Sequence, residues 1–163
     1  MGRTADYSHQ TCGIAETLEV VGDPWTLLIL RDSFRGVRRF EQWQERLGVA
    51  RNVLAARLKS LVAHGVLAPR RYSERPPRQE YVLTEKGRAL QPVLLTMLDW
   101  GNRHVYGENP PVQFIHDHCG HAFSPKLVCE HCNEGLIPGD LRRYELNEGA
   151  LTVGEALAKS DAS

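Results

Sequence analysis

The chain has 163 residues, and its 20 Lys and Arg balance its 20 Asp and Glu, so its formal net charge at pH 7 is zero. This length allows one domain with a substantial core and a small appendage. The chain has neither an apolar signal-peptide segment nor an apolar run near the roughly 18 residues of a membrane span, so a cytoplasmic protein without a membrane partner is predicted.

The charges are unevenly distributed along the chain. Residues 31–88 carry 14 Lys and Arg against 6 Asp and Glu, and the remainder carries the opposite excess. A basic block inside an otherwise acidic chain indicates a positively charged surface, which the zero net charge of the whole chain does not reveal. A solvated charged face is the alternative, but the block coincides with the structural motif described below.

The N-terminal part of the chain predicts a helix over residues 11–21, after a flexible polar segment over residues 1–10. Thr11 is placed to cap this helix. One apolar stripe runs along it at helical spacing, formed by Ile14, Leu18 and Val21.

A second helix is expected from Trp25 to Phe34, with Asp23 as its capping residue and Pro24 at its first position. The segment is apolar on most of its sides, and a helix of that kind is buried. It is therefore expected at the centre of the core, and Trp25 is interpreted as a core anchor in preference to a ligand-stacking residue.

Residues 38–83 predict two helices joined by a turn and followed by two strands. The first helix is expected over residues 40–47, and Gly48 supplies the turn after it. The second is expected to start at about Arg51 and to stop at Gly65. Its apolar residues recur at the spacing of a helix with one buried face, namely Leu54, Leu58, Leu61 and Val62.

The opposite face of this second helix is small-sided and polar, and carries Asn52, Ala56, Lys59, Ser60 and Ala63. The strands are expected over residues 66–72 and 80–83, with Pro76 and Pro77 forcing the arginine-rich link between them out of the ladder. A helix-turn-helix with such a hairpin is typical of a winged-helix DNA reader. The predicted fold class is mainly α, with a small antiparallel β-hairpin wing.

The residue types on this motif predict how it would contact DNA. The recognition helix, about residues 50–64, would present Arg51, Asn52 and Ala56 to base edges in the major groove. Arg with guanine and Asn with adenine each contribute about 1–3 kcal/mol of discrimination. Backbone contacts are expected from Arg38, Arg39, Lys59 and Ser60, and minor-groove or backbone contacts from Arg75 and Arg78 on the wing. Arg57 is left open between DNA contact and an internal ion pair.

A last helix is expected over residues 84–104, with Thr84 as its N-cap and a kink or late start at Pro92. Its wide apolar face lies outside the compact winged unit. With the helix over residues 11–21 it is predicted to form a homodimer interface, and packing within one chain is the alternative. Residues 11–106 are taken together as the DNA-binding and dimerisation domain.

Residues 107–111 are interpreted as a linker to a tail of different composition. The tail contains an H-x2-C pair and a C-x2-C pair separated by nine residues: His116, Cys119, Cys129 and Cys132. Two such chelating pairs predict a zinc-ribbon-like module over residues 112–140, with a structural Zn²⁺ closed by four ligands.

His118 or His121 could replace His116 in this site. The competing interpretations are a ribbon or set of thiols without metal, and a redox-active C-x2-C pair. Residues 141–163 are acidic and are expected to be partly disordered.

Several segments together closely resemble the HxlR family of bacterial winged-helix transcription regulators, relatives of the MarR group. They are CGIA from residue 12, GDPWTLLILR from 22, Arg39-Phe40, LAARLKSL from 54, GVL from 65, Pro76-Pro77 and EYVLTEKG from 80. The resemblance covers about residues 12–105. It implies a homodimer, formed through the first and last helices, that binds an inverted-repeat operator. Some members sense quinones, aldehydes or oxidants through an N-terminal cysteine, which Cys12 matches by position.

A sequence-specific DNA-binding regulator, preferably a repressor of transcription, is therefore the predicted function. A redox or small-molecule sensor is the first alternative, releasing DNA through Cys12 or through a pocket near Trp25 and Trp100. A thiol or metal enzyme using the Cys and His residues of the tail is the second. No phosphate loop or nucleophile elbow accompanies those residues and four ligands would saturate a metal, so the prediction is that the protein is not an enzyme.

Overall fold

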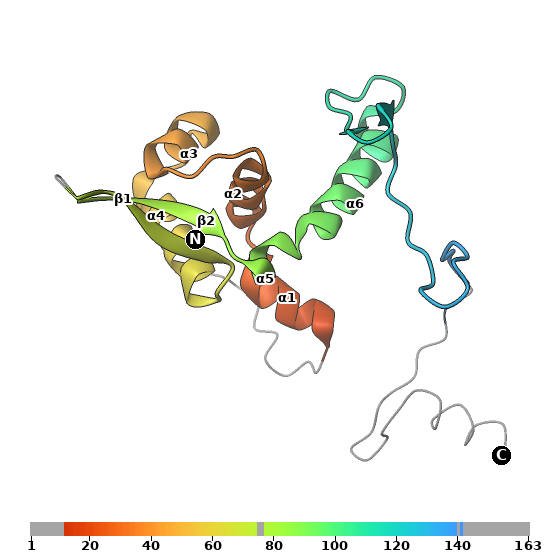
Figure 1. Ribbon diagram of the computed structural model, residues 1–163, viewed down its shortest axis with the longest axis horizontal. Helices are drawn as coiled ribbons and strands as arrows, with labels where there is room; N and C mark the ends of the chain where they lie inside the picture. The colour runs from red at the N-terminus through yellow and green to blue at the C-terminus, as the bar shows by residue number, and fades with distance from the viewer. Residues whose placement is uncertain (1–11, 75–76, 140, 142–163) are drawn as a thin grey trace, which may run out of the picture. The chain divides into compact units, whose positions relative to one another are not determined.

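The computed structural model describes residues 12–74, 77–139 and 141 (Figure 1). The chain divides into two compact units, one ending at Ala122 and the other beginning at Phe123. The helices of the first unit are α1 (Gly13–Val21), α2 (Pro24–Phe34), α3 (Phe40–Leu47), α4 (Arg51–Ala63), α5 (Glu85–Arg88), α6 (Gln91–Gly101) and the π-helical turn η1 (Asn102–Tyr106). Its strands are β1 (Leu67–Glu74), β2 (Pro77–Leu83), β3 (Ile115–His116) and β4 (His121–Ala122).

Helix α2 lies at the centre of the core, as its apolar sequence predicts. Ile29 and Leu30 are fully buried, and the helix contacts α1, α3, α4 and α6. The Asp23 carboxylate caps α2 by accepting the N–H groups of Trp25 at 3.0 Å and Thr26 at 3.3 Å. Trp25 is half-buried and packs against this core, which confirms its interpretation as an anchor.

Helices α3 and α4 form the expected helix-turn-helix. Gly48 (φ +62°) lies in the left-handed region between them, and Gly65 (φ +68°) lies there just after α4. Such backbone is favourable for glycine, so each residue ends a helix where its sequence position predicts. The buried stripe of α4 is confirmed by the three leucines that are almost fully enclosed, Leu54, Leu58 and Leu61.

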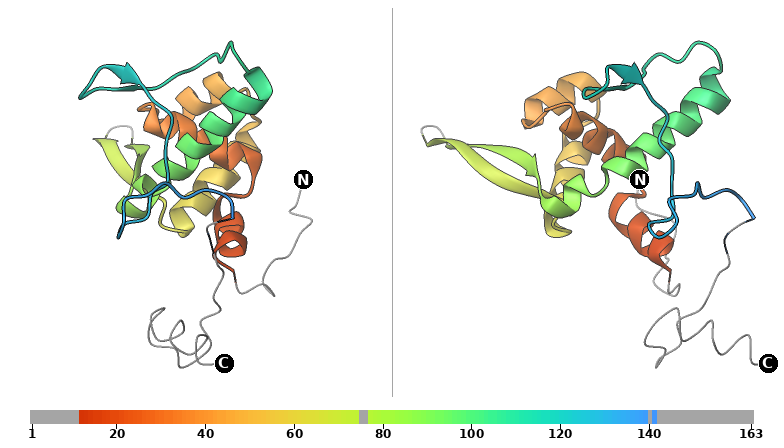
Figure 2. Two further views of the ribbon diagram at one scale, coloured as in Figure 1. Left: turned by 90° about the vertical axis from the view of Figure 1, so that its right-hand side faces the viewer. Right: turned by 45° about the vertical axis from the view of Figure 1, so that its right-hand side comes forward.

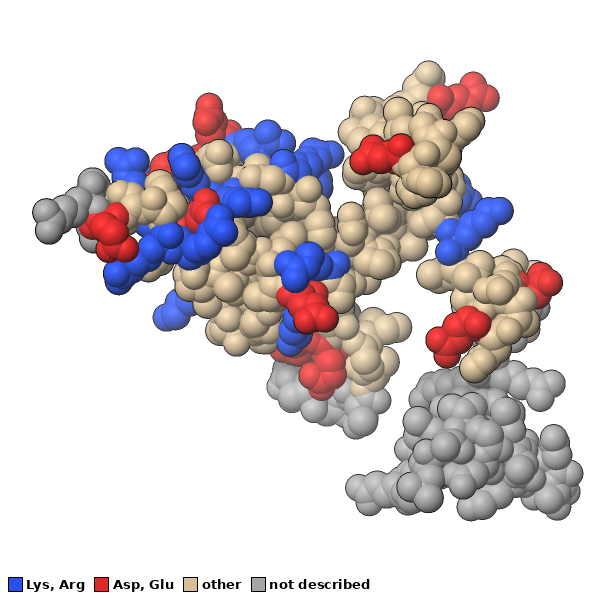
Figure 3. Space-filling view, in the orientation of Figure 1, with Lys and Arg blue, Asp and Glu red and all other residues tan. Residues whose placement is uncertain are grey.

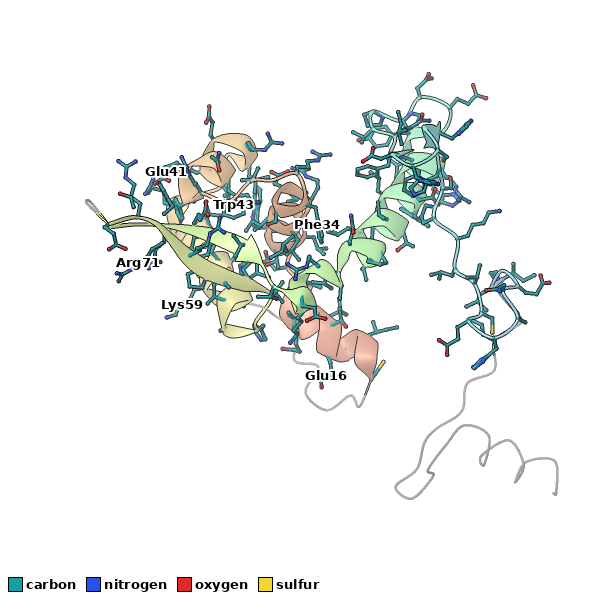
Figure 4. All side chains as sticks on the ribbon, viewed as in Figure 1. Glu16, Phe34, Glu41, Trp43, Lys59 and Arg71 are labelled. Atoms are coloured by element: carbon teal, nitrogen blue, oxygen red, sulfur yellow. The ribbon has the colours of Figure 1, made fainter. Side chains whose placement is uncertain are left out.

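Trp43 joins α3 to the rest of the core. Its side chain is completely buried, and its indole N–H donates to the carbonyl oxygen of Ile29 on α2 at 3.3 Å. Its ring centroid lies 6.1 Å from that of Tyr81 on β2, and Figure 4 shows the indole directed into the space between α3 and the hairpin. One side chain therefore connects three elements of the motif.

Asp32 makes a second connection between α2 and α3. Its carboxylate is fully buried and accepts Nε–H of Arg31 at 2.9 Å and Nε–H of Arg46, in the last turn of α3, at 3.3 Å. A buried charge is tolerated when it is paired and hydrogen-bonded. Asp32 thus holds the end of α3 against the central helix.

Strands β1 and β2 form an antiparallel hairpin that projects beyond the helices (Figures 1 and 2). The strands are longer than predicted, and the expectation that Pro77 stays outside the ladder is wrong, because Pro77 opposes Glu74. Pro77 is the first residue of β2, a position where proline is tolerated. Pro76 lies outside the described residues.

The base of the hairpin is closed by residues that directly follow it. The Thr84 hydroxyl accepts the N–H of Gly87 at 3.0 Å and so caps α5, as predicted, and the Thr84 N–H donates to the carbonyl oxygen of Val66 at 3.1 Å. A Cβ on Gly87 would lie 2.2 Å from the same Val66 oxygen. This close approach requires glycine, since no side chain fits between the two backbones.

A single helix over residues 84–104 is not formed, so that prediction is wrong. The segment divides into α5, α6 and η1. Pro92 has no N–H to donate to the carbonyl four residues earlier, so α5 cannot continue into α6. The late start expected at Pro92 is therefore confirmed, with the proline in the first turn of α6.

The first described residue, Cys12, stands at the N-cap position of α1. Thr11 and the segments expected to be flexible, residues 1–10 and 142–163, lie outside the described residues. Within the described ranges, no helix has both the length and the apolar character needed to cross a bilayer.

Replacing Trp43 with Ala is expected to lower the free energy of unfolding by about 3–5 kcal/mol, because it opens a large cavity in the core. Trp43→Phe keeps most of the ring and loses mainly the hydrogen bond, so a smaller loss of about 1 kcal/mol is expected. Urea unfolding followed by circular dichroism measures both. Equal losses in the two variants would contradict the anchoring role.

Candidate nucleic-acid interface

The outward face of α4 is open to solvent. Arg51, Asn52, Ala56 and Lys59 are exposed on it, and Ser60 is half-buried. Figure 4 shows Lys59 directed away from the core. No bulky apolar side chain stands among these residues, and Ala56 and Ser60 are small, so the helix can approach a groove closely.

Arg51 is held in place by α3. Its Nη1 donates to Gln44 Oε1 at 2.6 Å, and its guanidinium carbon lies 4.9 Å from the ring centroid of Phe40. A guanidinium has five N–H donors, so this contact leaves others available for a base. The structure therefore orients Arg51 at the start of the recognition helix through residues that sequence reasoning did not connect to it.

Arg39 connects α3 to the wing. Arg71 and Ser73 of β1 pair with neighbouring residues of β2, whereas Tyr72 between them has no partner there and forms a β-bulge. A bulge changes the direction in which a side chain points. The Tyr72 ring lies 4.3 Å from the Arg39 guanidinium carbon, within cation–π range. Both residues line a groove of about 590 Å³ that also includes Arg78.

The start of α3 adds two more exposed cations to this surface. Arg38 and Arg39 are exposed, and their backbone N–H groups donate to Gln42 Oε1 at 3.3 and 3.0 Å. This side-chain acceptor fixes the entry of the chain into the helix. The two arginines therefore project from an ordered helix N-terminus, where anions are favoured.

The wing contains more arginines than the sequence interpretation selected. Arg70 donates from Nε to the largely buried Glu80 at 2.8 Å, and Arg71 is exposed with Glu74 at 3.8 Å. Arg78 is exposed on β2, and Arg75 lies outside the described residues. Exposure of one of these two arginines could have been predicted from the sequence. Arg70 and Arg71 are adjacent in a predicted strand, and neighbouring residues of a strand point to opposite faces, so both cannot be turned toward the same partner.

Arg57 is not part of this surface. Its Nε lies 3.6 Å from Asp23 Oδ1, so the internal ion pair left open by the sequence is the arrangement observed. Figure 3 shows Lys and Arg side chains gathered over the part of the first unit that carries α3 and the hairpin. Among the arginines predicted to contact DNA, three are exposed at the start of α3 and on the hairpin: Arg38, Arg39 and Arg78.

The predicted metal ligands form two local pairs. His116 Nδ1 lies 3.4 Å from Cys119 Sγ in the first unit, and Cys129 and Cys132 belong to the second. The backbone N–H of Cys132, then that of His131, and the Cys132 side chain lower the pKa of the Cys129 thiol. Among the residues described, no group of three or more His, Cys, Asp or Glu is arranged to hold a metal ion.

The residues proposed for sensing lie in three different settings. Cys12 is exposed at the N-cap of α1. Trp25 packs on the core, whereas Trp100 on α6 is 62% exposed and lies 5.3 Å from the His104 ring centroid. The structure therefore gives the two tryptophans different roles in packing.

Comparison with known protein families decides the class of this fold. The family model described as HxlR-like helix-turn-helix matches residues 20–127. The chain belongs to the HxlR-like helix-turn-helix family. The match continues past residue 105, where the sequence resemblance was expected to end, and includes β3 and β4.

Relatives of this HxlR-like protein are transcription regulators. An HTH-type transcriptional regulator of Mycobacterium tuberculosis is 43% identical over 135 residues, which cover 81% of this chain and 85% of the relative. An HTH-type regulator of Bacillus subtilis, YdeP, is 34% identical over 103 residues, which cover 61% of this chain and 80% of the relative. The protein is accordingly a transcription regulator of the helix-turn-helix type, and its family implies DNA binding.

Solved structures show the same fold. A candidate transcription factor, PA1607, is 35% identical with a TM-score of 0.77, and the similarity covers 86% of this chain and 99% of that one. The redox regulator HypR in its reduced form is 32% identical with a TM-score of 0.54, covering 60% of this chain and 100% of that one. The prediction of a mainly helical protein with an antiparallel wing is thus confirmed.

Replacing Arg39 and Arg78 together with Gln is expected to weaken DNA binding on all sequences. Each lost phosphate contact should reduce the slope of log K against log salt by about 0.9. Arg57→Gln removes the same charge from an internal ion pair, so its salt slope should equal that of the wild type. An unchanged slope in the Arg39 and Arg78 double variant would contradict the assignment of these two residues to phosphate contacts.

Asn52→Ala should change the sequence preference and leave the slope of the salt titration unchanged, because Asn52 is assigned to a base and carries no charge.

Proposed function

We propose that the protein is a homodimeric, sequence-specific transcriptional repressor that binds an inverted-repeat operator. The observation that carries this proposal is the surface formed by α4, the N-terminus of α3 and the wing. It combines an exposed helix face with the arginines at the start of α3, whose backbone Gln42 fixes, and the Arg39 guanidinium lies over the Tyr72 ring. An open helix between two sets of ordered cations suits a major groove bordered by phosphates.

Base reading is assigned to the first turns of α4. Asn52 is exposed there and can pair with adenine through two hydrogen bonds, and Arg51 can pair with guanine. Ala56, one turn further, presents a methyl group suited to contact with a thymine methyl. Lys59 and Ser60 lie farther along the helix and are assigned to the backbone.

The proposed dimer interface consists of the apolar faces of α1 and α6. Ile14 is 73% exposed and Leu18 40% exposed on α1, while Met97 is 48% exposed on α6. With Trp100, these side chains provide apolar surface that a partner copy would cover. A two-fold dimer would present two recognition helices to half-sites about one helical turn apart, which explains an inverted repeat. A dimer spanning that length of a promoter excludes polymerase and so represses transcription.

The double variant Leu18→Asp/Met97→Asp is expected to be a monomer, because buried unpaired carboxylates disfavour the interface. Light scattering after size exclusion measures the mass. Affinity for the protein's own upstream region should fall about 100-fold or more, since two linked half-sites reinforce each other. Leu127→Asp changes an exposed leucine outside the interface and serves as the control; a wild-type monomer that binds the palindrome equally well would refute the proposal.

A redox-sensing regulator is the second candidate function. Cys12 is exposed and stands at the N-cap of α1, where the helix dipole favours an anionic side chain. The solved relatives include the redox regulator HypR in reduced and oxidised forms. Because α1 belongs to the proposed dimer interface, chemistry at Cys12 would alter the spacing of the recognition helices.

A diamide-type oxidant is expected to release DNA from the wild-type protein in a mobility-shift assay. Cys12→Ser should bind with unchanged affinity and resist release, and Cys119→Ser should respond as the wild type does. Oxidant-induced release that persists in Cys12→Ser would exclude Cys12 as the sensor.

A further inference from the structure

Helix α4 begins without the groups that usually stabilise the start of a helix. Ala50 at its N-cap position offers no side-chain acceptor, and its first turn contains no acidic residue. Arg51 is instead the first residue of the helix, where a cation opposes the helix dipole. Local helix stability therefore does not explain an arginine at this position, and such departures from local preference are expected at functional sites.

Two residues of α3 hold the Arg51 side chain. Phe40 and Gln44 are four positions apart, so they lie on the same face of α3. The Phe40 ring centroid lies 4.9 Å from the guanidinium carbon, within cation–π range. The Arg51 Nη1–H donates to Gln44 Oε1 at 2.6 Å. The guanidinium is thus held both by an aromatic ring and by a hydrogen bond.

Gln44 is itself anchored at the turn between α3 and α4. It directly follows Trp43, which is completely buried, and its own side chain is half-buried. Its carbonyl oxygen accepts the N–H of Gly48, the residue that ends α3, at 3.0 Å. The Oε1 acceptor therefore belongs to a residue whose backbone is held by the core on one side and by the turn on the other.

The contact with Gln44 leaves Arg51 able to read a base. It uses Nη1–H, and the Nε–H and Nη2–H groups of Arg51 have no partner among the described residues. These groups form an edge with two parallel donors, which matches the O6 and N7 acceptors of guanine. Asn52 differs, because its exposed side chain makes no hydrogen bond to any described residue.

We propose that Gln44 is a positioning residue that determines base specificity: with Phe40, it fixes the Arg51 guanidinium so that its Nε–Nη2 edge reads a guanine in each half-site. Gln44 acts through Arg51 and does not itself contact the base. An arginine that is ordered before binding loses less conformational freedom when it meets its base, so discrimination improves. This inference rests on the proposed function, in which the first turn of α4 reads bases.

The test uses the duplex that the full-length wild-type protein selects from a random-sequence pool. Affinities are measured for this duplex and for versions with each guanine replaced in turn, and Arg51→Ala identifies the position that Arg51 reads. Gln44→Leu is expected to lower discrimination at that position by about 3- to 10-fold, because the guanidinium must then be ordered on binding. Discrimination at the other positions and the salt slope should stay unchanged.

Three further variants separate positioning from a structural effect. Gln44→Glu keeps an acceptor for Arg51, so it should retain the discrimination while its negative charge weakens binding to all duplexes. Gln91→Leu makes the same substitution as Gln44→Leu outside the proposed DNA surface and should change nothing. The double variant Arg51→Ala/Gln44→Leu should match Arg51→Ala alone, since Gln44 acts only through Arg51.

Full discrimination in Gln44→Leu would overturn the inference and leave the proposed function intact. An equal loss at every position, in a Gln44→Leu variant whose circular dichroism matches the wild type, would also overturn it, as would a double variant weaker than Arg51→Ala. A wild-type protein that selects no sequence from the pool would instead refute the proposed function, and the inference with it.

Discussion

The burial of Trp43 is the contact on which the DNA-binding motif depends. An indole removed from water needs a partner for its N–H, and the carbonyl oxygen of Ile29 provides one on the central helix. The other side of the ring packs near Tyr81, which links α3 to the wing. With Arg46 bound to the buried Asp32, α3 is held at its middle and at its end. The recognition helix is positioned because the helix before it cannot move independently.

Net charge conceals which cations of this regulator are available to DNA. Arg57 and Arg70 are engaged by Asp23 and Glu80, so they contribute to internal cohesion. Arg39 is exposed, yet it is held against the Tyr72 ring and therefore loses less conformational freedom on binding. The usable basic surface is thus smaller than the count of arginines suggests, and it is more ordered.

Two turns of the tail, residues 116–120 and 129–133, are formed by local backbone hydrogen bonds, unlike the winged unit, which is held by its apolar core. Around Leu54 and Leu58 the chain is ordered by apolar burial, whereas the turns at His116 and Cys129 have almost none. Their repeated hydrogen bond and left-handed residue are local properties of the backbone. The family match includes the first turn, so this element belongs to the HxlR-like protein as much as its helices do.

Local patterns in the amino-acid sequence were enough to predict several helices and their ends, namely the leucine stripe of α4, the Asp23 and Thr84 caps and the glycine that follows α4. Each depends on residues within a few positions, where helical spacing and capping chemistry operate. The environment of each arginine could not be predicted in this way, because Arg51 contacts Gln44 and Arg39 contacts Tyr72 across separate elements of the folded chain. The break between α5 and α6 has a local and a tertiary component. Pro92 predicted it from the sequence, and the close approach of Gly87 to the Val66 carbonyl shows how the folded chain packs next to it.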